Sequence, residues 1–302
     1  MDDIAIYSAD TPHLTTLIKN LKKSFEISDL GEASFLLGLH ITYTLISIIL
    51  TQELYIGPIL TRFRMKNPNT VSIPLPKGII LMKETMEQPK EQVTTYQSVM
   101  EFLMYLVTGT RPDLGYTISF LAQFSSCPTK ERNKAAKHVF RYVNGTQNHG
   151  LFYPYTTTNT IKVYVDANFA GCHNTRRSTS GYIALFINCC ISWLSKKQAS
   201  VTKSTTKAEF ATMSYSTRHI RWLLKGLADL HLHVPIAIHT NNTGASFLAI
   251  NPQINVRTKY IAVDYFIMRE ALEDNIFILL NVESVNNLAD ICTNVLAQPV
   301  HQ

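Results

Sequence analysis

Three carboxylates stand where they could bind metal ions: Asp166, Glu209 and Asp290. Asp166 ends an alternating apolar run, V-Y-V-D, and the other two lie near the starts of expected helices. Hard cations such as Mg²⁺ are held by a few carboxylates together with water and phosphate oxygens. Two such ions about 3.5–4 Å apart can stabilise both the attacking and the leaving oxygen of a phosphodiester. The residue types suit metal-dependent phosphodiester hydrolysis, although Asp at the end of a strand also fits an ordinary turn.

The charge pattern around Asp166 and Glu209 fits a polyanionic partner. Between Ile161 and Lys225 the chain has ten Lys and Arg residues, and these two carboxylates are the acidic residues of that segment. Basic side chains that neutralise phosphates release counterions, which raises the affinity for nucleic acid. A solvated basic surface gives the same composition, so both interpretations stay open at this point.

A second basic feature is predicted on a helix near 129–143. Its members, spaced i, i+3, i+4 and i+7, are Lys134, Lys137, His138 and Arg141. This spacing places them on one helix face, and apolar residues occupy much of the remainder. The helix therefore has one face for packing and one for phosphates or solvent.

The composition is that of a globular protein long enough for two domains. The chain has 302 residues, of which 46% are hydrophobic and 17% charged, and its formal net charge is +6. The five cysteines show no zinc-site spacing, which predicts a reduced, intracellular protein. We expect no membrane association, because the N-terminus lacks a signal-peptide pattern and the longest apolar run, 36–50, is interrupted by polar residues.

Hydrophobic periodicity predicts the elements that would position these residues. For the first half we expect strands at 1–7 and within 33–56, and helices at 11–26, 57–66, 95–108, 112–125 and 129–143. For the second half we expect strands at 161–168, 181–187, 190–195, 236–240 and 276–282, and helices at 206–230, 243–250, 258–273 and from about Asn287. The polar segment 154–160 divides the chain into domains 1–153 and 160–302, and the second should be a mixed sheet covered by helices.

Six segments of the second half stand in a characteristic order: V-Y-V-D-A-N-F-A-G, T-R-R-S-T-S-G-Y, I-S-W-L-S-K-K-Q, S-T-T-K-A-E-F, V-R-T-K-Y-I and L-A-D-I-C-T. Together they resemble the ribonuclease H domain at the end of a copia-type retrotransposon Pol polyprotein. The first half contains D-D-I-A-I-Y-S, D-L-G-E, F-L-L-G-L-H-I, L-T-Q-E-L-Y-I, M-Y-L-V-T-G-T-R-P-D and A-A-K-H-V-F-R-Y-V-N-G-T. These segments are similar to the end of the same polyprotein's reverse transcriptase. The resemblance implies an α/β (α+β) fold: a ribonuclease H-like mixed five-stranded sheet with helices, preceded by a partial palm, thumb and connection region.

The resemblance also implies an Asp-Glu-Asp-Asp metal site that uses Mg²⁺ or Mn²⁺ to cut the RNA strand of an RNA–DNA hybrid. Asp166, Glu209 and Asp290 match its first, second and last members. Asn241 stands where the family has the third Asp. An amide oxygen can touch a cation but supplies no negative charge, so the loss should cost on the order of several kcal/mol of charge stabilisation. We therefore expect weak or absent catalysis.

Other departures from the family pattern point the same way. Tyr260 and Ala262 replace His and Asp of a Thr-Lys-His-Ile-Asp segment. Lys207 replaces an acidic residue two positions before the metal-site Glu. Asn168 and Phe169 replace Asp and Trp after the first strand of the domain. Together these changes indicate a sequence that is losing catalysis.

The remaining candidates concern nucleic acid and polymerisation. Besides the helical stripe, the candidate nucleic-acid contacts are Arg176, Arg177, Lys196, Lys197, Arg257 and Lys259. Asp2 and Asp3 match the polymerase's catalytic Asp-Asp pair. A third metal-binding Asp and the fingers would precede that pair, so we expect no polymerase activity from this chain alone.

Three functions stay open from the sequence. The chain could be a metal-dependent endoribonuclease on RNA–DNA hybrids, a module that binds hybrid or duplex without cutting, or an inactive remnant of an element. The expected partners are RNA–DNA hybrid or other nucleic acid, and other Pol polypeptides. Asn241 and the expected lack of a polymerase half favour the second and third functions over the first.

Overall fold

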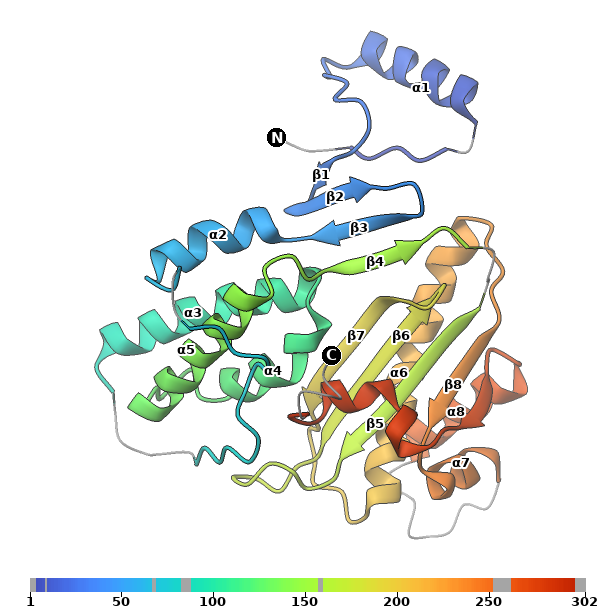
Figure 1. Ribbon diagram of the computed structural model, residues 1–302. Coiled ribbons are helices and arrows are strands. Elements are labelled where there is room, and N and C mark those ends of the chain that lie inside the picture. The colour runs from blue at the N-terminus through green and yellow to red at the C-terminus, as the bar shows by residue number, and fades with distance from the viewer. Residues whose placement is uncertain are drawn as a thin grey trace.

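The computed structural model describes residues 4–8, 10–66, 69–82, 88–156, 160–251 and 262–296, without the side chains of 262–265. Several predicted residues lie outside this part of the chain: Asp2, Asp3, Arg257, Lys259 and Tyr260. Two sheets and two buried apolar clusters organise the described residues, one of each in either half of the chain (Figure 1). The division at 154–160 into two domains stays a prediction.

The first sheet is antiparallel and joins distant parts of the first half. Its strands are β1 (Phe35–Leu36), β2 (Leu39–Tyr43), β3 (Ser47–Thr51) and β4 (Leu151–Pro154), in that order. β4 was not predicted from the sequence, because its four residues are too few to show strand alternation. The Tyr153 hydroxyl on β4 donates to the Cys190 carbonyl oxygen over 3.0 Å, so this sheet also contacts the second half.

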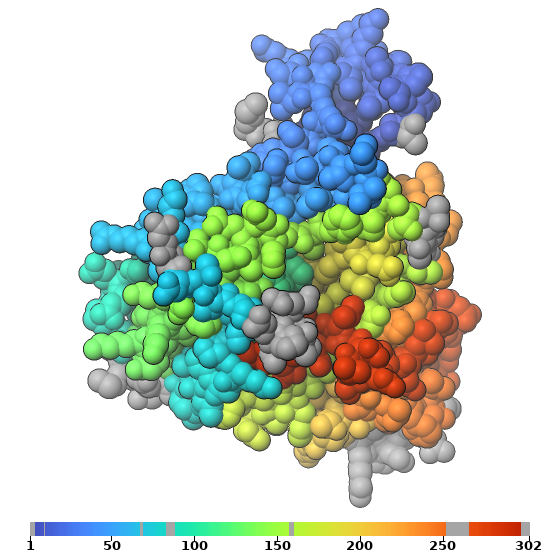
Figure 2. Space-filling view, in the orientation of Figure 1, coloured from blue at the N-terminus to red at the C-terminus, as the bar shows by residue number. Residues whose placement is uncertain are grey.

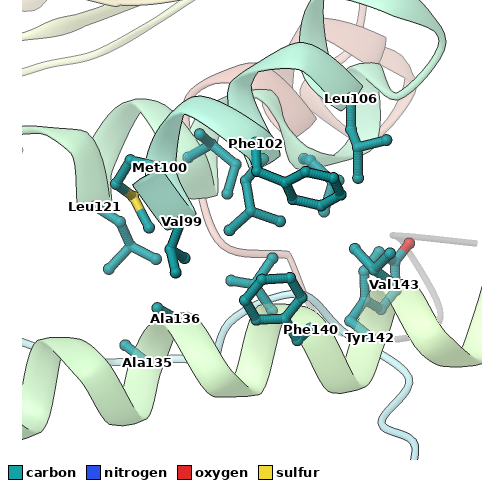
Figure 3. Packing of buried hydrophobic residues seen from close by; sticks show 14 of the residues in the cluster. Val99, Met100, Phe102, Leu106, Leu121, Ala135, Ala136, Phe140, Tyr142 and Val143 are labelled. Atoms are coloured by element: carbon teal, nitrogen blue, oxygen red, sulfur yellow. The ribbon is translucent and has the colours of Figure 1, made fainter. Parts of the chain in front are cut away.

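Helices beside this sheet form the first apolar cluster. They are α2 (Glu53–Arg62), α3 (Lys90–Gly109), the 3-10 turn η1 (Pro112–Leu114), α4 (Gly115–Ala122) and α5 (Lys130–Gly145). The apolar faces of α3 and α5 meet, and the rings of Phe102 and Phe140 stack with centroids 6.0 Å apart (Figure 3). Among the helices in the described residues, none is both long and apolar enough to cross a membrane.

The N-terminal segment projects from the rest of the molecule (Figure 2). It contains α1 (Thr11–Ser24), which begins where Asp10 accepts a hydrogen bond from the His13 backbone N–H. No residue of α1 is buried. Its apolar spacing predicted the helix correctly, but the helix does not pack on either cluster.

The second sheet is the predicted mixed five-stranded sheet, with order β7-β6-β5-β8-β9. Its strands are β5 (Ile161–Asn168), β6 (Thr179–Phe186), β7 (Cys189–Lys197), β8 (Ile236–Thr240) and β9 (Ile278–Asn281). β5 pairs antiparallel with β6 and parallel with β8, which places β5 at the centre. α6 (Thr205–Asp229) lies behind this sheet in Figure 1 and packs Phe210 and Met213 into the second apolar cluster. α7 (Thr243–Ile250), α8 (Ala262–Glu273), η3 (Ser284–Asn286) and η4 (Leu288–Cys292) complete the half.

Some predicted elements were wrong or had wrong bounds. Residues 4–8 form no strand. The helix predicted at 57–66 begins earlier, at Glu53, and contains Pro58 as an internal residue. The segment E-L-Y-I was assigned to the end of a strand because its residues alternate in hydrophobicity. It belongs to the helix because the helix buries Ile56 and Leu60 in the first apolar cluster. The final helix predicted from about Asn287 is the short 3-10 turn η4.

Candidate metal centre

β5 carries Asp166 to one end of the sheet. Val163 and Val165 are fully buried in the cluster that includes α6, and strand alternation turns Asp166 to the opposite face. Asp166 is only 6% exposed. Its carboxylate accepts a short hydrogen bond from the Thr293 hydroxyl, so the C-terminal segment covers it.

α6 brings Glu209 to the same end. The helix begins after Ser204, whose hydroxyl accepts a hydrogen bond from the Lys207 backbone N–H over 3.3 Å. Glu209 lies within the first turns and is 6% exposed. The Ala167 backbone N–H, next to Asp166, donates to the Glu209 carboxyl group. The other oxygen, Oε2, is buried and has no hydrogen-bond partner among the described residues, which is a costly arrangement for a carboxylate.

η4 holds Asp290 against the sheet through a glycine on β6. Gly181 pairs with Asp166 across the strands. A Cβ at position 181 would lie 2.6 Å from Thr293 Cγ2 and 2.8 Å from Cys292 Cβ, so a larger residue would push η4 away. Asn287 accepts from the Ala289 backbone N–H and donates from Nδ2 to the Val165 carbonyl oxygen over 2.9 Å. These contacts bring Asp290 to hydrogen-bonding reach of Asp166.

The pKa values of all three carboxyl groups are raised, first of all by burial. Burial, and next the charges of Asp166 and Asp290, raise the pKa of Glu209 to about 8. Burial, and next the charge of Asp166, raise the pKa of Asp290 to about 6. Burial also raises the pKa of Asp166, and hydrogen bonds from Thr293 and the Ala167 N–H partly offset the shift. Like charges gathered in a buried place would be stabilised by protons or by a cation.

Asn241 lies beside Asp166, as the sequence predicted. Thr240 ends β8 and pairs with Val165 of β5, so the next residues of the two neighbouring strands are Asn241 and Asp166. The Asn241 side chain donates from Nδ2 to the Ser284 hydroxyl over 3.2 Å. Asn241 thus lies next to Asp166 in the sheet and adds no negative charge there.

The side-chain oxygens gathered here are the kind of ligand that a hard divalent cation prefers. All ligands would be oxygens, and the buried Glu209 Oε2 lacks any other partner in the described chain. In that same part of the chain, no group of three or more His, Cys, Asp and Glu side chains is gathered closely enough to hold a metal ion as it stands. The centre is therefore a carboxylate cluster that has the right chemistry and an incomplete ligand set.

Comparisons with known proteins identify the family. A model of the reverse transcriptase (RNA-dependent DNA polymerase) family matches residues 1–77. Across 100% of its length, the chain is 32% identical to the retrovirus-related Pol polyprotein from transposon RE1 of Arabidopsis thaliana. Across 98%, it is 34% identical to that from transposon TNT 1-94 of Nicotiana tabacum. The chain belongs to the copia-type retrotransposon Pol polyproteins.

The chain corresponds to a limited part of these polyproteins. It spans 21% of the RE1 polyprotein and 23% of the TNT 1-94 polyprotein. Among solved structures, it resembles a foamy viral protease-reverse transcriptase in complex with double-stranded DNA, with a TM-score of 0.52 and 15% identity. The match covers 93% of this chain and 45% of that one. At this identity the likeness concerns the fold alone.

One departure from the copia pattern has a structural role. The Asn168 side chain donates from Nδ2 to the Thr293 carbonyl oxygen over 3.2 Å and to Asn294 Oδ1 over 2.8 Å. It therefore ties the end of β5 to the segment that follows η4. The other departures add little: Lys207 lies half-buried in the first turn of α6, Phe169 is 37% exposed, and the side chain of Ala262 lies outside the described residues.

The basic stripe of α5 is divided between packing and solvent. His138 Nε2 is 3.1 Å from the Ile73 carbonyl oxygen, and Arg141 donates from Nε to the Asn69 carbonyl oxygen. These two side chains hold the loop before α3 against α5. Lys134 and Lys137 are exposed, so they are the members of the stripe that can reach phosphates.

The other basic candidates lie on two adjacent pieces of the second half. Arg176 is exposed and Arg177 half-buried, both in the turn between β5 and β6. At the end of β7, Lys196 is exposed, and Lys197 donates to Gln123 Oε1 over 2.7 Å. Lys197 Nζ also lies 3.9 Å from Cys172 Sγ, which places this strand end beside the turn that carries the two arginines.

Sequence reasoning missed the residues that support the carboxylates. Gly181, Asn287 and Thr293 were not named as site residues, although two of them stand inside the segments T-S-G-Y and L-A-D-I-C-T. Their role depends on contacts between β6 and η4, which are more than a hundred residues apart. A Gly inside a strand was the one available signal, because it marks close approach of another part of the backbone.

Proposed function

We propose that the second half of this chain is a metal-dependent nuclease domain for the RNA strand of RNA–DNA hybrids, impaired by Asn241. The gathering of Asp166, Glu209 and Asp290 at one end of the sheet, each with a raised pKa, carries the proposal. Strongly raised pKa values within a group of carboxyls are typical of functional sites. The membership in copia-type Pol polyproteins supports the substrate class.

Asp166, Glu209 and Asp290 would hold Mg²⁺ or Mn²⁺. Such an ion would act as a Lewis acid and lower the pKa of a bound water. Thr293 keeps Asp166 oriented and favours its charged form. Asn287 and the small Gly181 set the position of Asp290, and the Ala167 N–H orients Glu209. The protein's own contribution is thus a set of held carboxylates at the end of β5.

The nucleic acid would lie along the basic residues near this end of the sheet. The candidates in the described part of the chain are Arg176, Arg177, Lys196, Lys197, Lys134 and Lys137. A similar fold in a foamy viral protein was solved with double-stranded DNA, which supports nucleic acid as the partner. An intracellular place of action and other Pol polypeptides as partners are part of the same proposal.

Hybrid cleavage tests the proposal directly. We would measure cleavage of an RNA–DNA hybrid in Mg²⁺ and in Mn²⁺ by the wild type and by Asn241→Asp. The expected result is weak or no cleavage by the wild type and clear cleavage by Asn241→Asp, because the added carboxylate completes the charge around the cation. Asn20→Asp adds the same charge on the exposed helix α1 and is the matched control. The double variant Asn241→Asp, Asp166→Asn should be inactive.

Failure of Asn241→Asp to cut, with its fold intact, would contradict the enzyme proposal. The second candidate, a module that binds hybrid without cutting, is favoured by the lack of a closed ligand cluster among the described residues. It predicts salt-dependent hybrid binding that Asp166→Asn leaves unchanged or improves, because a carboxylate near phosphate is removed. If hybrid binding is also absent, the chain is an inactive remnant.

A further inference from the structure

The outward face of α6 combines a large exposed ring with cations. Trp222 is 74% exposed on this face. Arg218, four residues before it, and Lys225, three residues after it, are exposed too, so the three share one helix face. A tryptophan left in solvent between two basic residues is an uncommon use of a large apolar side chain, and it indicates a partner.

The same surface continues toward the edge strand β7. Lys196 Nζ lies 5.4 Å from the centroid of the Tyr215 ring, and the Arg218 guanidinium carbon also lies 5.4 Å from it. The rings of Tyr215 and His219 are 4.9 Å apart. We call this surface the α6 patch: Lys196, Tyr215, Arg218, His219, Trp222 and Lys225.

The α6 patch has a one-sided charge. Between Glu209 and Asp229 the sequence of α6 contains no acidic residue. Two described acids pair with Arg221 on the flank of this face: Glu270 of α8 at 2.9 Å and Asp274, which follows α8, at 3.8 Å. Lys225 is exposed on α6 and Lys196 at the end of β7, and α6 places no carboxylate between Glu209 and Asp229, so a polyanion would complement these two cations.

Within the α6 patch, Trp222 is distant from the carboxylate centre. Trp222 follows Glu209 by thirteen residues along one continuous helix. At about 1.5 Å per residue this is roughly 20 Å along the axis. Lys196 lies nearer to that centre, because it pairs with Ser180, which pairs in turn with Ala167. A base stacked on Trp222 would thus contact a surface separate from the carboxylates.

We propose that the α6 patch binds single-stranded nucleic acid, with a base stacked on Trp222 and phosphates held by Lys196 and Lys225. The cations alone would suit a duplex equally well. The exposed ring favours a single strand over a duplex, because only unpaired bases can present their faces to an aromatic side chain. Tyr215, held under two cations, gives a second, more constrained ring beside it. This inference does not depend on the proposed cleavage.

Fluorescence anisotropy with a labelled oligo(dT) and the full chain, in EDTA, tests the patch. Trp222→Ala should weaken binding at least about fivefold, the lower end of one lost base–aromatic stack, and leave the salt dependence unchanged. Lys225→Ala should reduce the slope of log affinity against log salt by about 0.7, the value for one phosphate contact in a single strand. Trp222→Phe should retain most of the affinity.

Matched controls and two further probes distinguish stacking at the α6 patch from duplex binding and from binding to an anionic lipid surface. Phe35→Ala removes an exposed ring and Lys19→Ala an exposed cation in the N-terminal segment, and neither should change oligo(dT) binding. Unchanged affinity in Trp222→Ala would overturn the proposal. The proposal would also be overturned if Trp222→Ala weakened the binding of blunt duplex and of oligo(dT) equally. The same holds if Trp222→Ala reduced binding to anionic phosphatidylserine vesicles and left oligo(dT) binding unaffected. A protein that binds oligo(dT) through Trp222 but cuts no hybrid would contradict the proposed function and support this inference.

Discussion

Two buried groups of charged side chains, one in each half of the chain, are built in opposite ways. In the first half, Arg111 is 1% exposed and donates to Asp113 over 2.7 Å and to the Thr146 hydroxyl over 2.7 Å. The Tyr142 hydroxyl donates to the same Asp113 carboxylate over 2.9 Å. In the second half, Asp166, Glu209 and Asp290 bring together charges of one sign.

The difference separates a structural use of buried charge from a functional one. Burial alone would lower the pKa of Arg111, but the charge and hydrogen bonds of Asp113 raise it, so the guanidinium stays charged. The carboxylate cluster has no such counter-charge among the described residues, and burial raises its pKa values further. A fold retains a costly like-charge cluster where a ligand can compensate it. The pairing within R-P-D therefore stabilises the first half, whereas the carboxylates fit the proposed chemical role.

Breaking the paired group should have the largest effect. Arg111→Met leaves the half-buried Asp113 without its counter-charge, and we expect a loss of about 3 kcal/mol in the free energy of unfolding, the low end for a broken buried pair. Urea denaturation of the full chain measures it. Lys130→Met removes an exposed cation at the start of α5 and should change stability by less than about 0.5 kcal/mol. A loss below about 1 kcal/mol for Arg111→Met would mean that the pair contributes little.

Neutralising the like-charge group should instead stabilise the protein. The pKa of Glu209 is raised from 4.5 to about 8, so the folded state binds more protons than the unfolded state between these values. Stability therefore falls as pH rises from about 4.5 to about 8. The fall should amount to a few kcal/mol, at about 1.4 kcal/mol for each pKa unit.

Unfolding free energies at pH 5 and pH 8 test this sign. Glu209→Gln should flatten the dependence and be more stable than the wild type at pH 8. Glu91→Gln, on the exposed start of α3, should leave the dependence unchanged. A wild type that is as stable at pH 8 as at pH 5 would show that a cation or a rearrangement already compensates the cluster.

The sequence predicted this contrast only in part. The strands β5 and β8 and the helix α7 have the predicted bounds, because period-2 and period-3.6 patterns were clear there. Asp166, Glu209 and Asp290 were singled out by residue type and by their places in the expected elements, and the family motifs added Asn241. The pairing of Arg111 and Asp113 with Tyr142 and Thr146 was not predicted, since it joins distant positions of the chain. Patterns along the chain predict elements, and only tertiary contacts show which charges are paired.

Displacing η4 would test how the like-charge group is positioned. Gly181→Ala places a Cβ 2.6 Å from Thr293 Cγ2, so we expect a loss of about 1–3 kcal/mol as the segment shifts. The added methyl should also reduce cleavage in the Asn241→Asp background, because Asp290 moves with η4. Gly226→Ala is the matched control: its Cβ meets nothing within 4 Å on exposed α6, and it should gain roughly 0.5–1 kcal/mol. Equal effects of the two substitutions in urea denaturation would mean that the close approach at Gly181 is unimportant.

The smallest expected effect concerns the single hydrogen bond between Thr293 and Asp166. The Thr293 hydroxyl donates to Asp166 and lowers the pKa that burial raises. Thr293→Val removes this donor, and we expect a loss of about 1 kcal/mol at pH 8. The loss should shrink as pH falls through the folded-state pKa of Asp166, because a protonated carboxyl no longer needs the donor. Unfolding free energies at pH 4 and pH 8 measure it.

Thr212→Val gives the matched comparison for that hydrogen bond. The Thr212 hydroxyl donates to the Ala208 carbonyl oxygen over 3.0 Å and lies 2.7 Å from the Ser180 hydroxyl, and both partners are neutral. Its removal should cost a similar amount at every pH. If the two losses vary with pH in the same way, Asp166 does not carry a charge in the folded protein, and the like-charge cluster would reduce to a set of protonated acids. If only the Thr293→Val loss varies, the buried carboxylate is charged at neutral pH and is available to a cation.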